Sequence, residues 1–180
     1  LRLVSMTVIL CLGINYFSIY IQSVDLKFLS LWLSNSYFQK FFILLCFLFI
    51  INGSNLIDGF NGLLGMHLLI INVVLLSINI ANLELASIII AQIIVLLCFL
   101  LFNFPKAKIF FGDSGSYLFG TLLVLNIINT NNTQSNISSF FYCILLFYLF
   151  FEVFFSFFRK IYQRKSPLKP DNDHLHMLSY

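Results

Sequence analysis

The feature that most constrains the fold is a series of long apolar stretches separated by short polar breaks. A helix needs about 20 mostly apolar residues to cross the hydrocarbon core of a bilayer. Only 9% of the 180 residues are charged and 60% are hydrophobic, whereas about a quarter of a soluble domain is charged. Apolar stretches of this kind cover residues 4–22, 37–53, 63–80, 86–104, 115–130 and 139–158. The sequence therefore predicts an all-α, polytopic integral membrane bundle with about six transmembrane helices.

The breaks between these stretches are too short to hold a soluble domain, so residues 1–180 are interpreted as a single transmembrane domain. The chain begins at Leu1, directly before an apolar segment, and we interpret it as a fragment of a larger multi-helix domain. The Asn-rich segment 129–136 is predicted to be a solvated loop. A formal net charge of +3 is too small to favour a nucleic-acid partner.

Basic residues are distributed unevenly between the two sides of this predicted bundle. If six stretches cross the membrane, alternate breaks share a side. One side then carries eight basic residues and the other only Lys27 and Lys40. Basic residues favour the cytoplasmic side of a membrane protein. The breaks 54–62 and 105–114 and the basic tail 159–180 are therefore predicted to be cytoplasmic.

The first candidate motif is segment 52–65, Asn-Gly-Ser-Asn-Leu-Ile-Asp-Gly-Phe-Asn-Gly-Leu-Leu-Gly. Asn52, Asn55 and Asp58 are spaced by three, so a helix would place them on or near one face. A charged group at the centre of a bilayer costs about 2.5–3.5 kcal/mol, so it persists where it faces water, a metal or a substrate. The alternative is a helix end that forms a Gly-Asn turn and packs closely on a neighbour.

The second candidate motif is segment 103–116, Asn-Phe-Pro-Lys-Ala-Lys-Ile-Phe-Phe-Gly-Asp-Ser-Gly-Ser. Pro105 is expected to end the preceding helix, and Gly112 to begin the next. The carboxylate of Asp113 and the hydroxyls that follow it suit phosphate and Mg²⁺, because free backbone N–H groups gather at a helix start. The alternative is an ordinary N-cap, since Asp and Ser are both strong capping residues.

The third candidate motif is the basic tail 159–180, which contains His174 and His176. Basic residues beside a membrane favour phosphates and anionic head groups, and two histidines separated by one residue can act on a phosphate or bind a metal. The alternative is a solvated tail. Glu152 lies in a run of Phe and Val, so it is either a functional residue or the partner of a nearby Arg or Lys. His67 is interpreted as a packing or interfacial residue.

In this order the three motifs resemble those of the polyprenyl-phosphate N-acetylhexosamine-1-phosphate transferases, the MraY/WecA-like glycosyltransferases of family 4. The pattern Asn-x-x-Asn-x-x-Asp-Gly-x-Asp/Asn-Gly is met by residues 52–62. The pattern Lys-hydrophobic-Phe-x-Gly-Asp-x-Gly-Ser is met by residues 108–116, and Ser-Pro…Pro-Asp…His-x-His by residues 166–176.

The resemblance implies that a polyprenyl (undecaprenyl) phosphate attacks the β-phosphate of a UDP-N-acetylhexosamine and releases UMP. The lipid-linked product would start a surface glycan, such as O-antigen lipopolysaccharide or another cell-wall polymer. It also implies Mg²⁺, with Mn²⁺ as the alternative, an active site on the cytoplasmic face of the inner membrane, and compatibility with a homodimer. The implied residues are, for catalysis, Asp58, Asp113, His174 and His176; for the metal, Asp113 and Asn55; and for the substrate, Asn52, Asn61, Asn103, Phe110 and Lys108.

The sequence departs from the family pattern at three places. The family carries an earlier pair of adjacent aspartates, associated with activation of the acceptor, and this sequence has no Asp-Asp pair. We interpret the pair as lying upstream of Leu1, so the chain as given is expected to be inactive. Met177 stands where bacterial members often have a third histidine, and Asn61 where they often have an aspartate.

Two other functions remain open from the sequence. A transporter subunit also uses Gly, Asn and Asp at the ends of broken helices, but it places them near the middle of the bilayer. Here these residues gather at one predicted face, which favours the enzyme. The other alternative is an assembly protein whose motifs have decayed, and the retained Asp58, Asp113, His174 and His176 argue against it.

Overall fold

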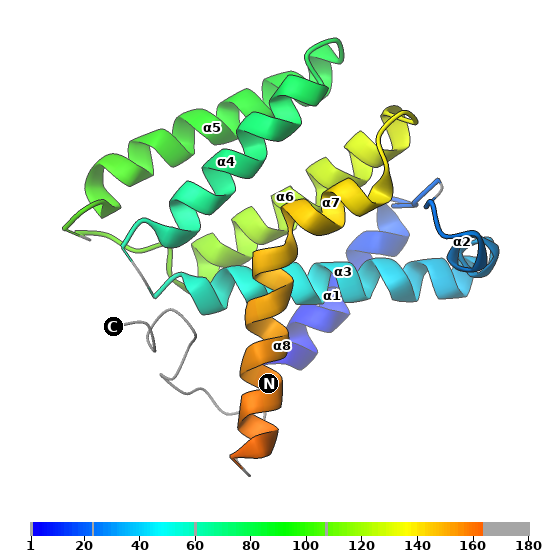
Figure 1. Ribbon diagram of the computed structural model, residues 1–180, viewed down its shortest axis with the longest axis horizontal. Helices are drawn as coiled ribbons and strands as arrows, with labels where there is room; N and C mark the ends of the chain where they lie inside the picture. The colour runs from blue at the N-terminus through cyan, green and yellow to red at the C-terminus, as the bar shows by residue number, and fades with distance from the viewer. Residues whose placement is uncertain (1, 23, 60, 107, 164–180) are drawn as a thin grey trace.

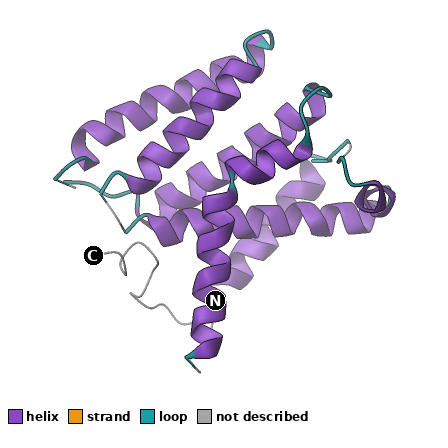
Figure 2. Cartoon of the chain, in the orientation of Figure 1, coloured by secondary structure: helices purple, strands orange, loops and turns teal. Residues whose placement is uncertain are grey.

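The computed structural model describes residues 2–22, 24–59, 61–106 and 108–163. Within these ranges the chain forms eight α-helices and no strand (Figures 1 and 2). The all-α prediction is therefore confirmed. The helices are α1 (Arg2–Tyr16), α2 (Lys27–Leu33), α3 (Ser36–Ile57), α4 (Leu63–Ile78), α5 (Leu83–Asn103), α6 (Gly112–Thr133), α7 (Ser139–Leu145) and α8 (Phe147–Tyr162).

Every predicted apolar stretch contains helix, but fewer helices than expected can cross a bilayer by length and composition. In the described part of the chain, α3 and α5 qualify, and α7 with α8 makes a third span if this pair, bent by 62°, counts as one. At 1.5 Å per residue, α1 and α4 are only about 22–24 Å long, against a hydrocarbon core of about 30 Å. Helix α6 has 22 residues, but it is polar at both ends.

Two predicted boundaries are wrong because polar residues continue a helix instead of ending it. Helix α3 continues through the first part of the expected break at 54–62 and ends at Ile57. Helix α6 continues through the expected loop at 129–136 as far as Thr133. There the hydroxyl of Thr133 donates to the carbonyl of Asn129 at 2.9 Å, and that of Thr130 donates to Asn126 at 2.7 Å. These bonds satisfy the hydroxyls inside the helix, so the polar side chains do not break it.

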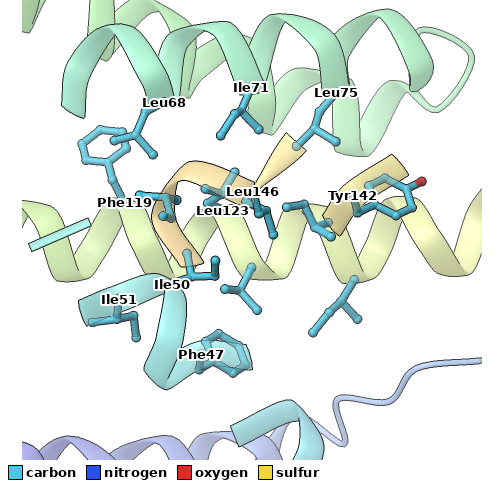
Figure 3. Packing of buried hydrophobic residues seen from close by; sticks show 14 of the residues in the cluster. Phe47, Ile50, Ile51, Leu68, Ile71, Leu75, Phe119, Leu123, Tyr142 and Leu146 are labelled. Atoms are coloured by element: carbon cyan, nitrogen blue, oxygen red, sulfur yellow. The ribbon is translucent and has the colours of Figure 1, made fainter. Parts of the chain in front are cut away.

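Helix α3 lies at the centre of the bundle and packs against α1, α6 and α8. A Cβ atom on Gly120 of α6 would lie 3.1 Å from Cα of Ile51, and one on Gly53 would lie 2.7 Å from the carbonyl oxygen of Leu149 in α8. Glycine thus lets α6 and α8 approach α3 closely on two sides. Figure 3 shows the apolar core between these helices and α4, which includes Phe47, Ile50, Leu68, Leu123 and Leu146.

Hydrogen bonds between residues far apart in sequence close the bundle at two opposite ends. At one end, which we call the site end, the turn 58–62 lies against the segment 103–112. At the other, the clip end, the carboxylate of Asp25 accepts hydrogen bonds from the hydroxyl of Ser138 and from the backbone N–H of Ser139. The bond from the Ser138 hydroxyl is the main reason that the pKa of Asp25 is lowered. The two motifs 52–65 and 103–116 therefore meet at one end, as the alternation of the breaks predicted.

Candidate active site

The last turns of α3 present the first motif to the start of α6. Asn55 uses its amide Nδ2 to donate to Oδ1 of Asp113 at 2.9 Å and to Oγ of Ser116 at 3.2 Å. Asn52 behaves differently, since its Nδ2 donates to the carbonyl of Leu48 within α3 at 2.6 Å. One amide group of α3 thus joins the two motifs, and Asn52 does not take part in this link.

Helix α6 begins at Gly112, whose φ of 61° lies in the left-handed region that favours glycine. Asp113 follows in the first turn, half-buried, where the free N–H groups of a helix start favour negative charge. Ser116 is buried, and its hydroxyl donates to the carbonyl of Gly112 at 2.8 Å. The carboxylate of Asp113 therefore lies at the helix start, where it accepts a hydrogen bond from Asn55, which also bonds to the buried hydroxyl of Ser116.

Asp58 caps the end of α3 and brings a second carboxylate to the same helix start. Its Oδ2 accepts a hydrogen bond from the backbone N–H of Gly112 at 2.8 Å. Burial is the main reason that the pKa of Asp58 is raised to about 6, and the nearby charge of Asp113 raises it further, while bonds from Gly112 and Phe111 oppose the rise. Two carboxylates thus lie on one negatively charged surface, which a bound cation would stabilise.

The donor set at this surface fits Mg²⁺. Magnesium prefers oxygen ligands and is held by one or two carboxylates together with water and substrate phosphates. Asp58 and Asp113 supply carboxylates and Asn55 an amide beside them. Among the described residues there is no group of three or more His, Cys, Asp or Glu side chains suited to a metal ion. The residues present thus supply oxygen ligands of the kind that Mg²⁺ prefers.

The turn after α3 is fastened to the segment after α5 by two asparagines. Asn103, which is 2% exposed, accepts from the N–H of Gly62 through Oδ1 and donates to the carbonyl of Ile109 at 2.6 Å. Asn61 is exposed and donates to the carbonyl of Pro105 at 3.0 Å. Gly62 has φ of 78°, which few other residues adopt. Both asparagines, predicted as substrate residues, hold loops together in this structure.

Phe110 and Lys108 lie on the exposed side of the same segment. Phe110 is 52% exposed, whereas the next residue, Phe111, turns inward and stacks on Phe99 with 3.7 Å between the ring centroids. The side chain of Lys108 is exposed, and its backbone N–H donates to the carbonyl of Phe102. The segment that leads to the start of α6 thus carries an exposed aromatic ring and an exposed cation. His174 and His176, the remaining predicted site residues, lie outside the described residues.

A groove of about 460 Å³ opens beside Asp113, and sequence reasoning did not predict it. Its polar lining residues include Asp113 and Ser114, and apolar side chains line most of the remainder. The groove could not be predicted because the sequence alone does not place α1 beside α6. The position of Ser116 could be predicted, since it follows Asp113 by about one helical turn. The lining residues are Ser5, Met6, Ile9, Leu10, Ile51, Asp113, Ser114, Tyr117, Leu118 and Thr121.

Comparison with known proteins identifies relatives of the chain. The undecaprenyl-phosphate alpha-N-acetylglucosaminyl 1-phosphate transferase of Thermotoga maritima is 33% identical over 135 residues, which are 75% of this chain and 41% of that protein. The probable undecaprenyl-phosphate N-acetylglucosaminyl 1-phosphate transferase of Bacillus subtilis is 29% identical over 130 residues, which are 71% of this chain and 36% of that protein. The chain thus spans about two-fifths of the length of these relatives. No solved structure shows significant similarity to it.

The profile of one protein family also covers most of the chain. The family is described as glycosyl transferase family 4, and it matches residues 1–131. This range contains both motifs that meet at the site end. The helical membrane architecture, the motifs and the match agree, and the chain belongs to glycosyl transferase family 4.

Proposed function

We propose that the protein containing this chain transfers an N-acetylhexosamine 1-phosphate from a UDP-sugar to a polyprenyl phosphate. The observation that carries the proposal is the hydrogen bond from Asn55 to Asp113, which joins the two motifs beside a largely apolar groove. A phosphoryl transfer to a lipid needs a polar centre at the membrane face together with an apolar path for the lipid. The names of the two relatives describe transferases that act on undecaprenyl phosphate, which supports the same acceptor here.

In the proposed reaction an oxygen of the acceptor phosphate attacks the β-phosphorus of the UDP-sugar. A new P–O bond forms, the bond to the bridging oxygen breaks, and UMP leaves with the electron pair. Donor and acceptor are both anionic, so the reaction depends on positioning and on neutralising charge. Mg²⁺, or Mn²⁺, held by Asp113 with Asn55 beside it, would supply that neutralisation. Lys108 adds a positive charge from the chain itself.

Other residues of the site end would orient the two substrates. The exposed ring of Phe110 suits stacking on the uracil base. Asn61 and Asn103 keep the turn 58–62 and the segment 103–112 in register, and Asp58 keeps the start of α6 against that turn. The groove between α1 and α6 would offer the polyprenyl chain a largely apolar path beside Asp113. His174 and His176 would contact the phosphates from the tail.

The positive-inside bias supports a cytoplasmic position for the site end in an inner membrane. A UDP-sugar is a cytoplasmic donor, so this orientation brings the carboxylates and the nucleotide to the same side. The lipid-linked product would then start a surface glycan, such as O-antigen lipopolysaccharide or another cell-wall polymer.

The test is a transfer assay on the natural full-length protein in membranes. It supplies labelled UDP-N-acetylglucosamine, polyprenyl phosphate and Mg²⁺, and compares Asp113→Asn with Asp25→Asn, a carboxylate at the clip end. We expect lipid-linked product that requires the metal, is lost with Asp113→Asn and persists with Asp25→Asn. Product from another UDP-N-acetyl sugar would change only the donor. Folded protein that gives no product with any UDP-sugar would overturn the proposal.

A further inference from the structure

Glu152 is a buried acidic residue that the proposed reaction does not use. It lies on α8 and is 0% exposed. Its Oε1 accepts a hydrogen bond from the phenolic Oη of Tyr148, one helical turn earlier, at 3.1 Å. The ring of Tyr148 packs edge-on against the imidazole of His67 on α4, with 5.6 Å between the ring centroids. Three side chains from two helices thus form one contact cluster.

This cluster lies where α8 touches both helices that flank the turn 58–62. Leu149, the residue after Tyr148, places its backbone against Gly53 of α3, so closely that a Cβ atom there would lie 2.7 Å from the carbonyl oxygen. Consecutive residues of α8 therefore contact α3 and α4. Figure 1 shows α8 crossing α3 close to the point where the chain leaves α3 for α4. Asp58 and Asn61 lie in the turn between these two helices.

A buried acid in this position has a cost that packing alone does not explain. An apolar side chain would fill the same space in a membrane bundle without the penalty of a buried carboxyl group. What a carboxyl group adds is a directed acceptor for the hydroxyl of Tyr148, which fixes the ring against His67. Direct packing between α3 and α4 is sparse compared with the packing of α3 on α6 or α8. The angle between α3 and α4 therefore depends on other elements. Helix α6 packs against both of them, and α8 adds a contact to each, at Gly53 of α3 and at His67 of α4.

We infer that Glu152 is a positioning residue, which holds Tyr148 against His67 and so contributes, beside the packing of α6, to the geometry of the turn that carries Asp58 and Asn61. It touches no reacting atom in this role. The catalytic consequence rests on the proposed transferase function, whereas the geometric consequence does not.

The kinetic test uses the natural full-length protein and four variants. Tyr148→Phe removes only the hydroxyl, Glu152→Ala removes the acceptor, and Glu152→Gln keeps an acceptor in the same place. Tyr142→Phe is the matched control, because Tyr142 is also buried and its hydroxyl has no hydrogen-bond partner among the described residues. We expect kcat/KM per folded protein to fall about tenfold in Tyr148→Phe, the effect of one lost interaction, and at least as far in Glu152→Ala. Glu152→Gln and Tyr142→Phe should stay close to the unmodified protein.

Coupling separates this role from a general loss of stability. If Tyr148 acts through its bond to Glu152, the double variant Tyr148→Phe/Glu152→Ala should be no worse than Glu152→Ala alone. Additive losses, or a Glu152→Gln variant as impaired as Glu152→Ala, would overturn the inference.

A distance measurement tests the geometry without using activity. Spin labels are placed at Ile70→Cys on α4 and Phe158→Cys on α8, whose side chains are 60% and 63% exposed, after the native cysteines are replaced by serine. We expect the distribution of distances to broaden or shift with Tyr148→Phe and Glu152→Ala, and to stay unchanged with Tyr142→Phe. Unchanged distributions in all variants would reject the positioning role even if the transferase activity is found. If the distributions change in a protein that has no transferase activity, the positioning role of Glu152 is kept and only the proposed function is rejected.

Discussion

At the scale of single residues, the site depends on how one amide group is shared. Asn55 donates both to the carboxylate of Asp113 and to the hydroxyl of Ser116, across 58 positions of sequence in the first case. Spacing predicted that Asn52, Asn55 and Asp58 would share a helix face, and family resemblance placed Asn55 beside Asp113. Spacing did not predict that Asn52 would bond within its own helix, since both amides carry the same donors.

Replacing Asn55 by Leu should remove both bonds and leave Asp113 less firmly held. The loss of hydrogen bonds worth about 1 kcal/mol each should lower stability by about 1–3 kcal/mol, and misplacing a metal ligand should lower activity or metal affinity about 10–100-fold. Thermal unfolding and the Mg²⁺ dependence of transfer measure the two effects. The control is Asn15→Leu, which also removes an amide with two bonds, at the clip end. Equal loss of activity in both variants would contradict the specific role of Asn55.

Asp58 should make stability depend on pH, and the variant Asp58→Asn, whose amide does not titrate, should lack this dependence. The pKa of Asp58 is raised from 3.8 to about 6, so the folded chain binds this proton more tightly than the unfolded chain. Its contribution therefore favours folding below about pH 4 and is lost as pH rises through 6. Measured in EDTA, the melting temperature of Asp58→Asn relative to the unmodified protein should increase between pH 4 and pH 7. A difference that stays constant over this range would show that the carboxyl group titrates normally.

At the scale of helices, the apolar runs predicted where helix occurs better than where each helix ends. The hydrophobic stretches identified α4 and α5 closely, because their residues are apolar almost throughout, whereas α3 continues into polar residues at its end. Helix α2 is only seven residues long and lies in a predicted break. No Pro or Gly lies at the bend between α7 and α8, so the local sequence does not predict the bend. The bend therefore depends on tertiary packing. The contact of α8 with Gly53 is one such packing constraint.

Gly53→Ala should separate α3 from α8, whereas Gly13→Ala should be harmless. A Cβ atom at residue 53 would lie 2.7 Å from a backbone oxygen of Leu149, which no side-chain rotation relieves, while nothing lies within 4 Å of one at residue 13. Overpacking of this kind costs about 1–3 kcal/mol, and replacing glycine inside a helix gains about 0.5–1 kcal/mol. Thermal unfolding of the two variants tests the contrast. Similar stability for both would mean that α8 does not pack tightly on α3.

At the scale of the whole molecule, the two ends of the bundle differ in chemistry. The site end gathers Asp58, Asp113 and the lysines of the segment after α5, whereas the clip end ties the loop after α1 to the start of α7 through Asp25. The side chain of Asn132 adds to that tie by bonding to the backbone of Tyr20 and Gln22, both at 2.8 Å. The sequence predicted this division through its uneven basic residues, but the tie itself requires three-dimensional proximity that no local pattern encodes.

The orientation of the two ends in the membrane is open to direct measurement. Lys106→Cys lies at the exposed site end and Leu83→Cys, 80% exposed, at the start of α5 near the opposite end. In a protein whose native cysteines are replaced by serine, a membrane-impermeant maleimide should label Lys106→Cys only in inside-out vesicles and Leu83→Cys only in right-side-out vesicles. The physical reason is the cost of moving basic residues across the bilayer, which retains the lysines on the cytoplasmic side. Labelling of both positions from the same side would refute the crossing by α5. The reverse labelling pattern would place the carboxylates of the site end on the side of the membrane away from a cytoplasmic UDP-sugar.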